Sequence, residues 1–410
     1  MYKLDLIHTL AMAGLVIFLG YGIRRIVKPL ARYNVPAPVI GGLLFSVVIL
    51  IAQQNEVDLF QFDTTLQTPL MIAFFTTIGF GASLALLKTG GPQVIKFFII
   101  ATIFAVVQNL LGVLLSYPLG VHPLFGVMTG SVTLTGGPAT GLAFAPLFEQ
   151  AGVQAAASVA IAAALVGITS GGLLGGPIGT YLIEKYKLKS ARLHQPDPVL
   201  ATDGGKNENQ IPDDTLSSTS GESRGSYVIL KSCVAILIAM WVGSWVSQWF
   251  ASLGITLPAY IGAMLIAAVI RNLDDTTGLL KLPLRTMDDI GSVVLSLFIA
   301  MALMTLKLWK LADLALPLIV ILFFQIVLIA ISCLWLIFRW TGRDYDSAVI
   351  SSGFCGFMLG TTANAMANME ALVEKYGAAP RAYMVVPLVG AFFIDFTNAL
   401  IITAFLNFFR

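Results

Sequence analysis

Ten apolar runs recur along this chain of 410 residues, most of them close to the length that a helix needs to cross a bilayer. That length is about 20 mostly apolar residues. Inside the hydrocarbon only helices and closed barrels satisfy their own backbone groups. The chain is 57% hydrophobic and 11% charged, whereas soluble domains are about a quarter charged. We therefore predict an all-α integral membrane protein, with spans near 7–23, 38–53, 69–87, 96–117, 155–182, 227–251, 257–270, 290–306, 314–338 and 382–408.

Two further apolar segments, 123–149 and 345–372, are interrupted near their middle by glycine and threonine. Gly137 of the first is separated from Gly356 of the second by the same number of residues as Gly141 is from Gly360. Broken backbone at membrane depth is tolerated only where it is buried in protein or lines a watery cavity. We predict that both are re-entrant hairpins, here called the first and second hairpin segments. The alternative is that they are an eleventh and a twelfth straight span.

The basic residues predict the topology. If both hairpin segments leave the membrane on the side they enter, twenty of the 24 Lys and Arg residues fall on one face. Cytoplasmic loops carry an excess of these residues. Both termini are therefore expected to be periplasmic, with segment 190–226 in the cytoplasm.

Segment 190–226 is polar and rich in Gly, Ser and Asn, and it is expected to be a flexible cytoplasmic linker. It separates a first membrane repeat, 1–189, from a second, 227–410. Each repeat has five spans and one hairpin segment, and an odd number of crossings inverts the second repeat relative to the first. The first hairpin segment should then enter from outside and the second from inside. This is the plan of two inverted repeats found in secondary transporters.

Asp395 is the one carboxylate deep inside an expected span. A charge at that depth is costly and commonly functional. Asn398 lies one helical turn further on and shares its face. Hard cations prefer oxygen ligands, so Asp395 and Asn398 are candidate Na⁺ ligands, together with carbonyl groups freed by a hairpin break, which we expect to be the break of the second segment. The alternatives are a structural role in capping or joining helices, and coupling to protons instead of Na⁺.

The polar and glycine residues of the hairpin segments are the candidate substrate site. Helix N-termini at a hairpin tip offer free N–H groups and a positive dipole end to an anion. Alternatively, these side chains satisfy freed backbone or join helices. No Lys or Arg lies mid-membrane, so co-transported cations would supply positive charge for an anionic substrate. The candidates are Thr133, Thr135, Gly136, Gly137, Thr140, Gly141, Gly356, Gly360, Thr361, Thr362, Asn364 and Asn368.

Other polar and small residues in the spans favour packing roles. Thr76, Thr77 and the pair Gln108 and Asn109 are secondary candidates for ligand contact. The glycines of segment 171–176 are expected to let helices approach closely. They do not follow a strand, as a nucleotide-binding loop would.

The chain resembles the bacterial sodium–glutamate symporter family. The motifs are Asn34-Val-Pro-Ala-Pro-Val-Ile-Gly-Gly42, Ala73-Phe-Phe-Thr-Thr-Ile-Gly79, Thr133-Leu-Thr-Gly-Gly137, Leu295-Ser-Leu-Phe-Ile-Ala-Met-Ala-Leu303 and Val386-Pro-Leu-Val-Gly-Ala-Phe-Phe-Ile-Asp395. The resemblance implies Na⁺-coupled uptake of L-glutamate across a bacterial inner membrane, by a homodimer with an elevator-type movement. The family's hairpins often carry a histidine beside the glycines, where this chain has Pro138, Ala139 and Phe354. A related dicarboxylate or hydroxycarboxylate therefore stays open as the substrate.

Two other classes of membrane protein fit the sequence less well. A membrane-embedded enzyme needs paired carboxylates, a Ser/His pair or a metal cluster at depth. Asp395 has no second carboxylate in the middle of an expected span, and no histidine lies in the middle of one. A passive channel would not need an inverted duplication. No cofactor beyond the co-transported Na⁺ is expected. The dispersed basic residues and a net charge of +2 predict no nucleic-acid partner.

Overall fold

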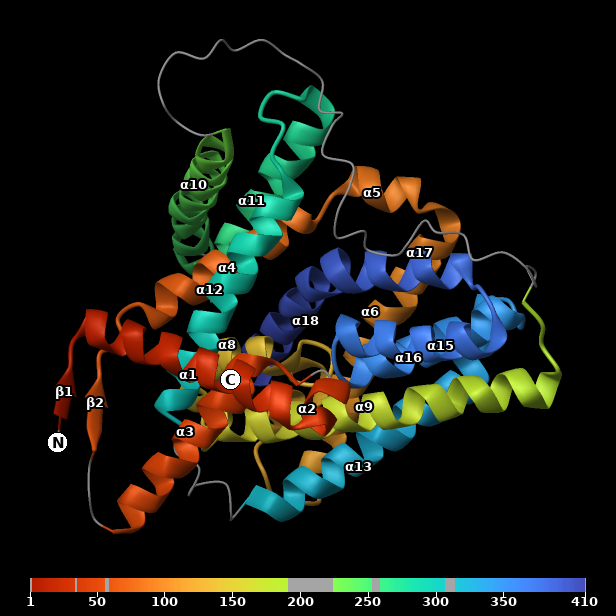
Figure 1. The fold of residues 1–410 in the computed structure, drawn as a ribbon, viewed down its shortest axis with the longest axis horizontal. Coiled ribbons are helices and arrows are strands. Elements are labelled where there is room, and N and C mark those ends of the chain that lie inside the picture. Colours follow the sequence, from red (N-terminus) through yellow and green to blue (C-terminus); the bar gives the residue numbers. More distant parts are fainter. Residues whose placement is uncertain are drawn as a thin grey trace.

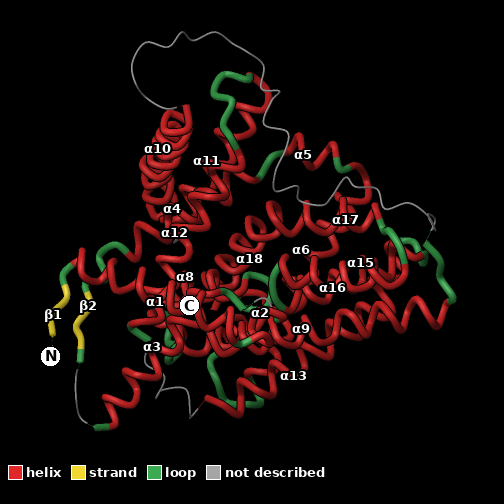
Figure 2. Tube along the Cα trace, in the orientation of Figure 1, coloured by secondary structure: helices red, strands yellow, loops and turns green. Residues whose placement is uncertain are grey.

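The computed structural model describes residues 2–33, 35–55, 59–190, 224–252, 259–306 and 314–409, and helices dominate them (Figures 1 and 2). In this part of the chain, seven helices are long and apolar enough to cross a membrane. This confirms an all-α, multi-pass membrane protein. The seven are α1 (Leu6–Ile26), α3 (Ala37–Gln54), α6 (Gly91–Ser116), α9 (Ala156–Tyr186), α10 (Arg224–Ser252), α12 (Leu284–Met304) and the continuous run of α13 (Ala315–Ser332), η3 (Cys333–Ile337) and α14 (Phe338–Thr341).

The other three expected spans are shorter, interrupted or less apolar. The span expected at 69–87 ends early, as α4 (Gln67–Gly81), and a short α5 (Leu84–Thr89) follows. Helix α11 (Ala259–Thr277) carries charged residues in its last two turns, which lowers its mean hydropathy. The last expected span is divided into α17 (Pro380–Leu388), the π-helical turn η4 (Val389–Phe393) and α18 (Ile394–Phe409). A proline inside α17, Pro387, lacks the N–H of a regular helical turn.

The helices form two bundles (Figure 1). In the first bundle, α3 and α4 pack on α12, α1 packs on α3, and α10 packs on α11, which in turn packs on α4. The second bundle contains both hairpin segments, packed around α6 and α9. Of the long helices of the first bundle, α1, α3 and α4 come before residue 190, and α10, α11 and α12 come from residue 224 onward. Both halves of the chain thus contribute to each bundle.

The second bundle is completed by the hairpin helices. The first hairpin segment contains α7 (Pro123–Val127), the π-helical turn η1 (Met128–Val132) and α8 (Gly137–Gln150). The second contains α15 (Tyr345–Leu359) and α16 (Thr362–Tyr376). The short helix α2 (Lys28–Arg32) joins α1 to α3 in the first bundle.

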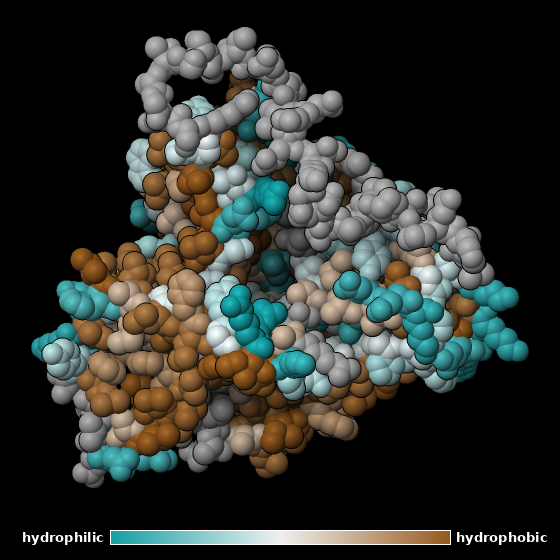
Figure 3. All heavy atoms as spheres, in the orientation of Figure 1, coloured by the Kyte–Doolittle hydropathy of each residue, from teal (hydrophilic) through white to brown (hydrophobic). Residues whose placement is uncertain are grey.

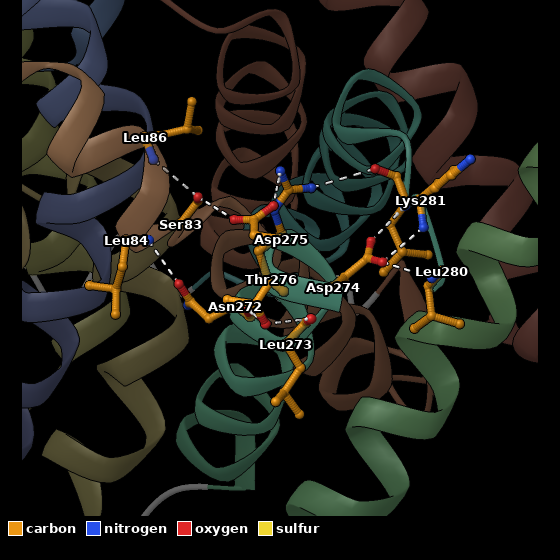
Figure 4. Close-up of polar contacts among 12 residues, drawn as sticks. Ser83, Leu84, Leu86, Asn272, Leu273, Asp274, Asp275, Thr276, Leu280 and Lys281 are labelled. Carbon is orange, nitrogen blue, oxygen red and sulfur yellow. Dashed lines mark hydrogen bonds and ion pairs between the residues drawn. The ribbon is translucent and has the colours of Figure 1, made fainter. Parts of the chain in front are cut away.

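The break after α4 is a fixed corner held by polar side chains of α11 (Figure 4). The Asn272 amide donates to the Ala82 carbonyl at 2.8 Å and accepts from the Leu84 N–H at 2.8 Å. It replaces backbone partners that the break removes. The Ser83 hydroxyl donates to the Asp275 carboxylate. These partners are distant in sequence, so the apolar run alone could not show the corner.

Two features at the ends of the first bundle differ from the expectations. The strands β1 (Tyr2–Leu4) and β2 (Phe60–Phe62) pair in parallel, with Tyr2 opposite Phe60, and they add a small sheet to the helical fold. Helix α10 begins at Arg224, so the last residues of the expected linker 190–226 are helical. The rest of that linker, from residue 191 to 223, lies outside the described residues.

The outer surface of the first bundle is apolar. Figure 3 shows a broad hydrophobic area over α1 and α3, with hydrophilic residues gathered near the ends of these elements. Leu15, Phe18 and Ile51 are among its exposed side chains. Such a surface suits contact with lipid chains and would be unfavourable in water.

Candidate functional site

Both hairpin segments are pairs of helices joined by a break. In the first, the non-helical Gly130 (φ −99°, ψ −129°) lies inside η1, and residues 133–136 form a turn before α8. In the second, Gly360 (φ −153°, ψ −99°) ends α15, and Thr361 caps the N-terminus of α16 through its hydroxyl. The glycine pattern therefore located both breaks in the right segments.

The tips of the two hairpin segments meet. A Cβ added to Gly137 would lie 3.7 Å from the Gly360 carbonyl oxygen and 3.8 Å from the Thr361 methyl carbon. Gly137 begins α8, and Thr361 is the N-cap of α16. Two helix N-termini therefore converge at one place. Each contributes N–H groups and the positive end of a helix dipole, which together favour an anion.

Gln108 of α6 joins the two tips from one side. Its amide nitrogen donates to the Met358 carbonyl of the second hairpin segment at 2.9 Å. Its amide oxygen accepts from the Thr135 hydroxyl of the first at 2.7 Å. Gln325 of α13 donates to the Gln108 carbonyl at 2.7 Å. Gln108 is fully buried, and both ends of its side chain are bonded, so it fixes the distance between the tips.

Several first-segment candidates satisfy or pack their own tip. The Thr133 hydroxyl donates to the Met128 carbonyl at 2.8 Å. A Cβ on Gly141 would lie 3.0 Å from the Thr133 methyl carbon, and one on Gly136 would lie 2.6 Å from the Thr140 Cβ. The small residues thus allow the turn to close tightly. For Thr133 the hydrogen bond is the structural role that the sequence had left open.

The two asparagines of α16 fasten the second hairpin segment to α9. Asn364 donates to the Ile168 carbonyl at 2.7 Å, and Asn368 donates to the Gly171 carbonyl at 2.9 Å. Four glycines at every fourth position of α9 face this segment: Gly167, Gly171, Gly175 and Gly179. The expectation of close helix approach is met at Gly175, where a Cβ would lie 2.0 Å from the Asn368 amide nitrogen, but not at Gly176, where it would meet nothing within 4 Å.

The region around Asp395 lies between the hairpin segments. Gly390 in η4 packs on the second, where an added Cβ would lie 2.8 Å from the Thr362 hydroxyl. Asn398 in α18 contacts the first, where its amide donates to the Ser131 carbonyl at 3.0 Å. The carbonyl that Asn398 meets thus comes from the first hairpin segment. That the second segment supplies a carbonyl partner to Asp395 stays a prediction. Asp395 stands between these two contacts in sequence.

Unpaired oxygen atoms accompany Asn398. The Ser131 N–H donates to the Asn109 side-chain oxygen of α6 at 2.9 Å, which holds the break in η1 open. The Ser131 hydroxyl and the Asn398 amide oxygen are buried, and neither has a hydrogen-bond partner among the described residues. Hydroxyl and amide oxygens are suitable ligands for a hard cation.

Comparison with known proteins supplies the family. A family model described as "Sodium/glutamate symporter" matches residues 2–378. The chain belongs to the sodium/glutamate symporter family. A sodium/glutamate symporter of Escherichia coli (strain K12) is 38% identical over 99% of this chain and 98% of its own length. One from Shigella flexneri has the same identity and coverage. One from Haemophilus influenzae is 34% identical, with 97% and 96% covered.

A cavity of about 840 Å³ opens between the bundles of this symporter-family chain. The end of α8 and the start of α9 line one side, with Glu149 and Pro146, and the end of α12 lines the other, with Thr305. The cavity therefore lies where the first hairpin segment faces the first bundle. A change in how the bundles meet would change access to this hairpin.

The sequence did not single out all of the polar residues at the tips. Ser131 lies in the same glycine- and threonine-rich stretch as Thr133 but was not a candidate. Gln108 and Asn109 were secondary candidates with packing favoured. An amide pair inside an apolar run was the available signal for α6, because buried amides must find partners. Among the described residues no group of three or more His, Cys, Asp or Glu could hold a metal ion.

Proposed function

We propose that this protein takes up L-glutamate across the bacterial inner membrane, driven by co-transported Na⁺. The observation that carries the proposal is the convergence of two helix N-termini at the meeting hairpin tips, next to the segment that holds Asp395. Membership of the sodium/glutamate symporter family supports both substrate and ion. An enzymatic role finds no support in this arrangement.

The substrate would bind at the hairpin tips. A glutamate carboxylate can accept N–H groups from the starts of α8 and α16. The hydroxyls of Thr361 and Thr362, which are partly exposed, would add donors. Thr135, Asn364 and Asn368 would act mainly by holding the tips in place, through the hydroxyl of the first and the amide nitrogens of the other two. The Asn364 amide oxygen is buried without a partner among the described residues.

Na⁺ would bind beside the substrate, at Asp395 and Asn398. The Ser131 hydroxyl is an additional candidate ligand, because it is buried and unpaired among the described groups. A cation there would neutralise the Asp395 carboxylate, whose burial in the membrane is otherwise costly. It would also supply positive charge near an anionic substrate, which links the two binding events.

The two bundles suggest the movement. In an elevator-type mechanism the second bundle, with the hairpins, would move against the first. The two halves of the chain would be inverted repeats, each with five spans and one re-entrant hairpin. Both termini would be periplasmic and residues 190–226 cytoplasmic. Proteins of this plan are commonly oligomeric, and we propose a homodimer, as the resemblance implies.

A second candidate function is transport of a related dicarboxylate or hydroxycarboxylate, coupled to Na⁺ or H⁺. The observation that favours keeping it is that residues 138, 139 and 354 lack the histidine typical of the family. Two converging helix N-termini recognise a carboxylate whichever molecule carries it.

Uptake by proteoliposomes decides between these functions. Labelled L-glutamate should accumulate when a Na⁺ gradient is imposed, and not with a H⁺ gradient or with no gradient. Unlabelled malate and citrate should compete poorly. Accumulation driven only by H⁺, or competition by a hydroxycarboxylate stronger than that by glutamate, would favour the second candidate. Glutamate equilibration without accumulation in every gradient would indicate a channel.

A further inference from the structure

A groove of about 490 Å³ runs along the first half of α6, remote from the hairpin tips. Ile95, Ile99 and Ile103 line it, at every fourth position and so on one helical face. They extend over about 12 Å of the helix. Their side chains are 38%, 51% and 46% exposed, and Trp340 of α14 forms the facing wall. The groove has the width and chemistry for an alkyl chain.

One end of the groove is positively charged. Lys88 in the last turn of α5 and Lys96 in the second turn of α6 both line it. Both side chains are exposed, and neither has a carboxylate partner within the described part of the chain. Helix α6 starts at Gly91 with no side-chain cap and no acidic residue in its first turn. Its positive dipole end is therefore available to an anion.

We infer that this charged end lies at a membrane boundary. Helix α6 is a candidate span that begins beside the groove, and the run that contains Trp340 is another that ends there. Tryptophan is enriched at this depth, where its ring meets the headgroups. The isoleucines extend from the boundary toward the membrane interior.

We propose that the groove binds an anionic phospholipid. Its phosphate would lie between Lys88 and Lys96 at the start of α6, and one acyl chain would follow the three isoleucines toward the membrane centre. The lysines favour a net negative headgroup over a zwitterionic one, because neither is neutralised by the protein. This site is separate from the hairpin tips and does not depend on which substrate is transported.

The position of the site means that a bound lipid would contact the connection between the two bundles. Lys88 and Lys96 stand on either side of the join at Gly90 and Gly91, where Gly91 adopts a positive φ of 71°. This join leads from α5, which contacts α11 of the first bundle, to α6 of the second. The start of α5 is anchored through the Asn272 contacts described above. A bound phosphate would tie both sides of this connection together.

The test is lipid binding by the purified full-length protein, counted by native mass spectrometry. The protein is titrated with phosphatidylglycerol or with phosphatidylcholine of the same acyl chains. We expect a saturable phosphatidylglycerol adduct, and Lys88→Gln/Lys96→Gln should weaken it roughly 30-fold. The matched control Lys185→Gln/Lys189→Gln removes the same charge at the end of α9 and should leave the adduct unchanged.

A second variant separates the groove from general charge. Ile99→Trp fills the groove and keeps both lysines, so it should also weaken the adduct. Equal binding of both lipids, unchanged binding in Lys88→Gln/Lys96→Gln, or unchanged binding in Ile99→Trp would overturn the proposal. Thermal unfolding in detergent checks that each variant is folded. If the groove variants unfold, a photoactivatable phosphatidylglycerol is crosslinked to wild-type protein instead. A crosslink at Ile99 or Ile103 would support the proposal, and its absence from both would overturn it.

Discussion

The two hairpin segments differ in how their breaks are held. The second is fastened along its length to one helix, α9, by glycine packing and by Asn364 and Asn368. The first is held at its break by single side chains from two different helices, Asn109 of α6 and Asn398 of α18. The first break leaves two buried oxygen atoms without partners among the described residues, on Ser131 and Asn398, whereas the second leaves one, on Asn364.

This difference suggests a division of roles. A segment sealed against a long helix is built for stability and moves with that helix. A break held by a few amides, with unpaired oxygens beside Asp395, is built to accept a ligand. Damage to the first break should therefore affect ion coupling, and damage to the second should affect folding.

The largest expected effect comes from Asp395→Asn. The change keeps the size and removes the charge, so concentrative uptake should fall to the level of empty liposomes. Asp395→Glu should also fail, because hard-cation sites depend on ligand reach. The melting temperature should change little, since Asn is easier to bury than Asp. Asp63→Asn, at a partly exposed site outside the expected spans, is the control for loss of one carboxylate. Normal Na⁺ dependence in Asp395→Asn would reduce Asp395 to a structural residue.

The next effect tests the second segment. Gly167→Ala places a methyl group 2.3 Å from the Leu359 carbonyl oxygen, and overpacking of this kind costs about 1–3 kcal/mol. Gly176→Ala on the same helix meets nothing within 4 Å and should be neutral or stabilising. Thermal unfolding in detergent measures both. If the two variants had the same melting temperature, α9 and the second segment would not be packed as described.

Asn398→Ala should have a smaller effect, of a different kind. Removing one oxygen ligand and the bond to Ser131 should raise the Na⁺ concentration for half-maximal uptake by about tenfold. The maximal rate at saturating Na⁺ should be kept better than the affinity. Uptake measured over a range of Na⁺ concentrations separates the two quantities. A lower rate with unchanged Na⁺ affinity would count against a ligand role.

The smallest effect concerns the start of the second segment, where Asp344 forms an ion pair with Arg381. Burial raises the pKa of Asp344, but hydrogen bonds from Arg381 and Ser347 outweigh it and hold the pKa below its usual value. The stabilisation is therefore complete above the unfolded pKa, about 3.9, and is lost as the pH falls through the folded value. Because the side chain is half-exposed, its size should be below about 1 kcal/mol.

Thermal unfolding at several pH values checks this prediction. Asp344→Asn can still cap α15 but cannot pair with Arg381, so it should melt lower than the wild type near pH 7. The two proteins should converge only when the pH has fallen below the folded pKa of Asp344, which lies below about 3.9. A constant difference across this range would show that the carboxylate charge plays no part. The first helix of the first segment differs in its cap, which is the side chain of His122 and not a carboxylate.

Much of the architecture was predictable from composition and glycine spacing. The lengths of the apolar runs indicated most membrane helices, and the glycines placed both breaks in the right segments. The pairing did not give their positions, because Gly141 and Gly356 lie inside α8 and α15. The corner after α4 was not predictable, because Asn272, which replaces its lost backbone contacts, is 190 residues away in sequence from Ala82. The same holds for Ser131, whose carbonyl meets an amide 267 residues further on.

By itself, the sequence determined where this chain must be helical in a membrane and where it cannot be. Both follow from local physics: apolar runs bury only as helices, and glycine-rich stretches interrupt them. Only the tertiary structure decided that the two tips meet, that Gln108 joins them, and that Asn398 contacts the first break. Those outcomes depend on which distant groups satisfy each broken backbone, and no local pattern specifies a partner hundreds of residues away.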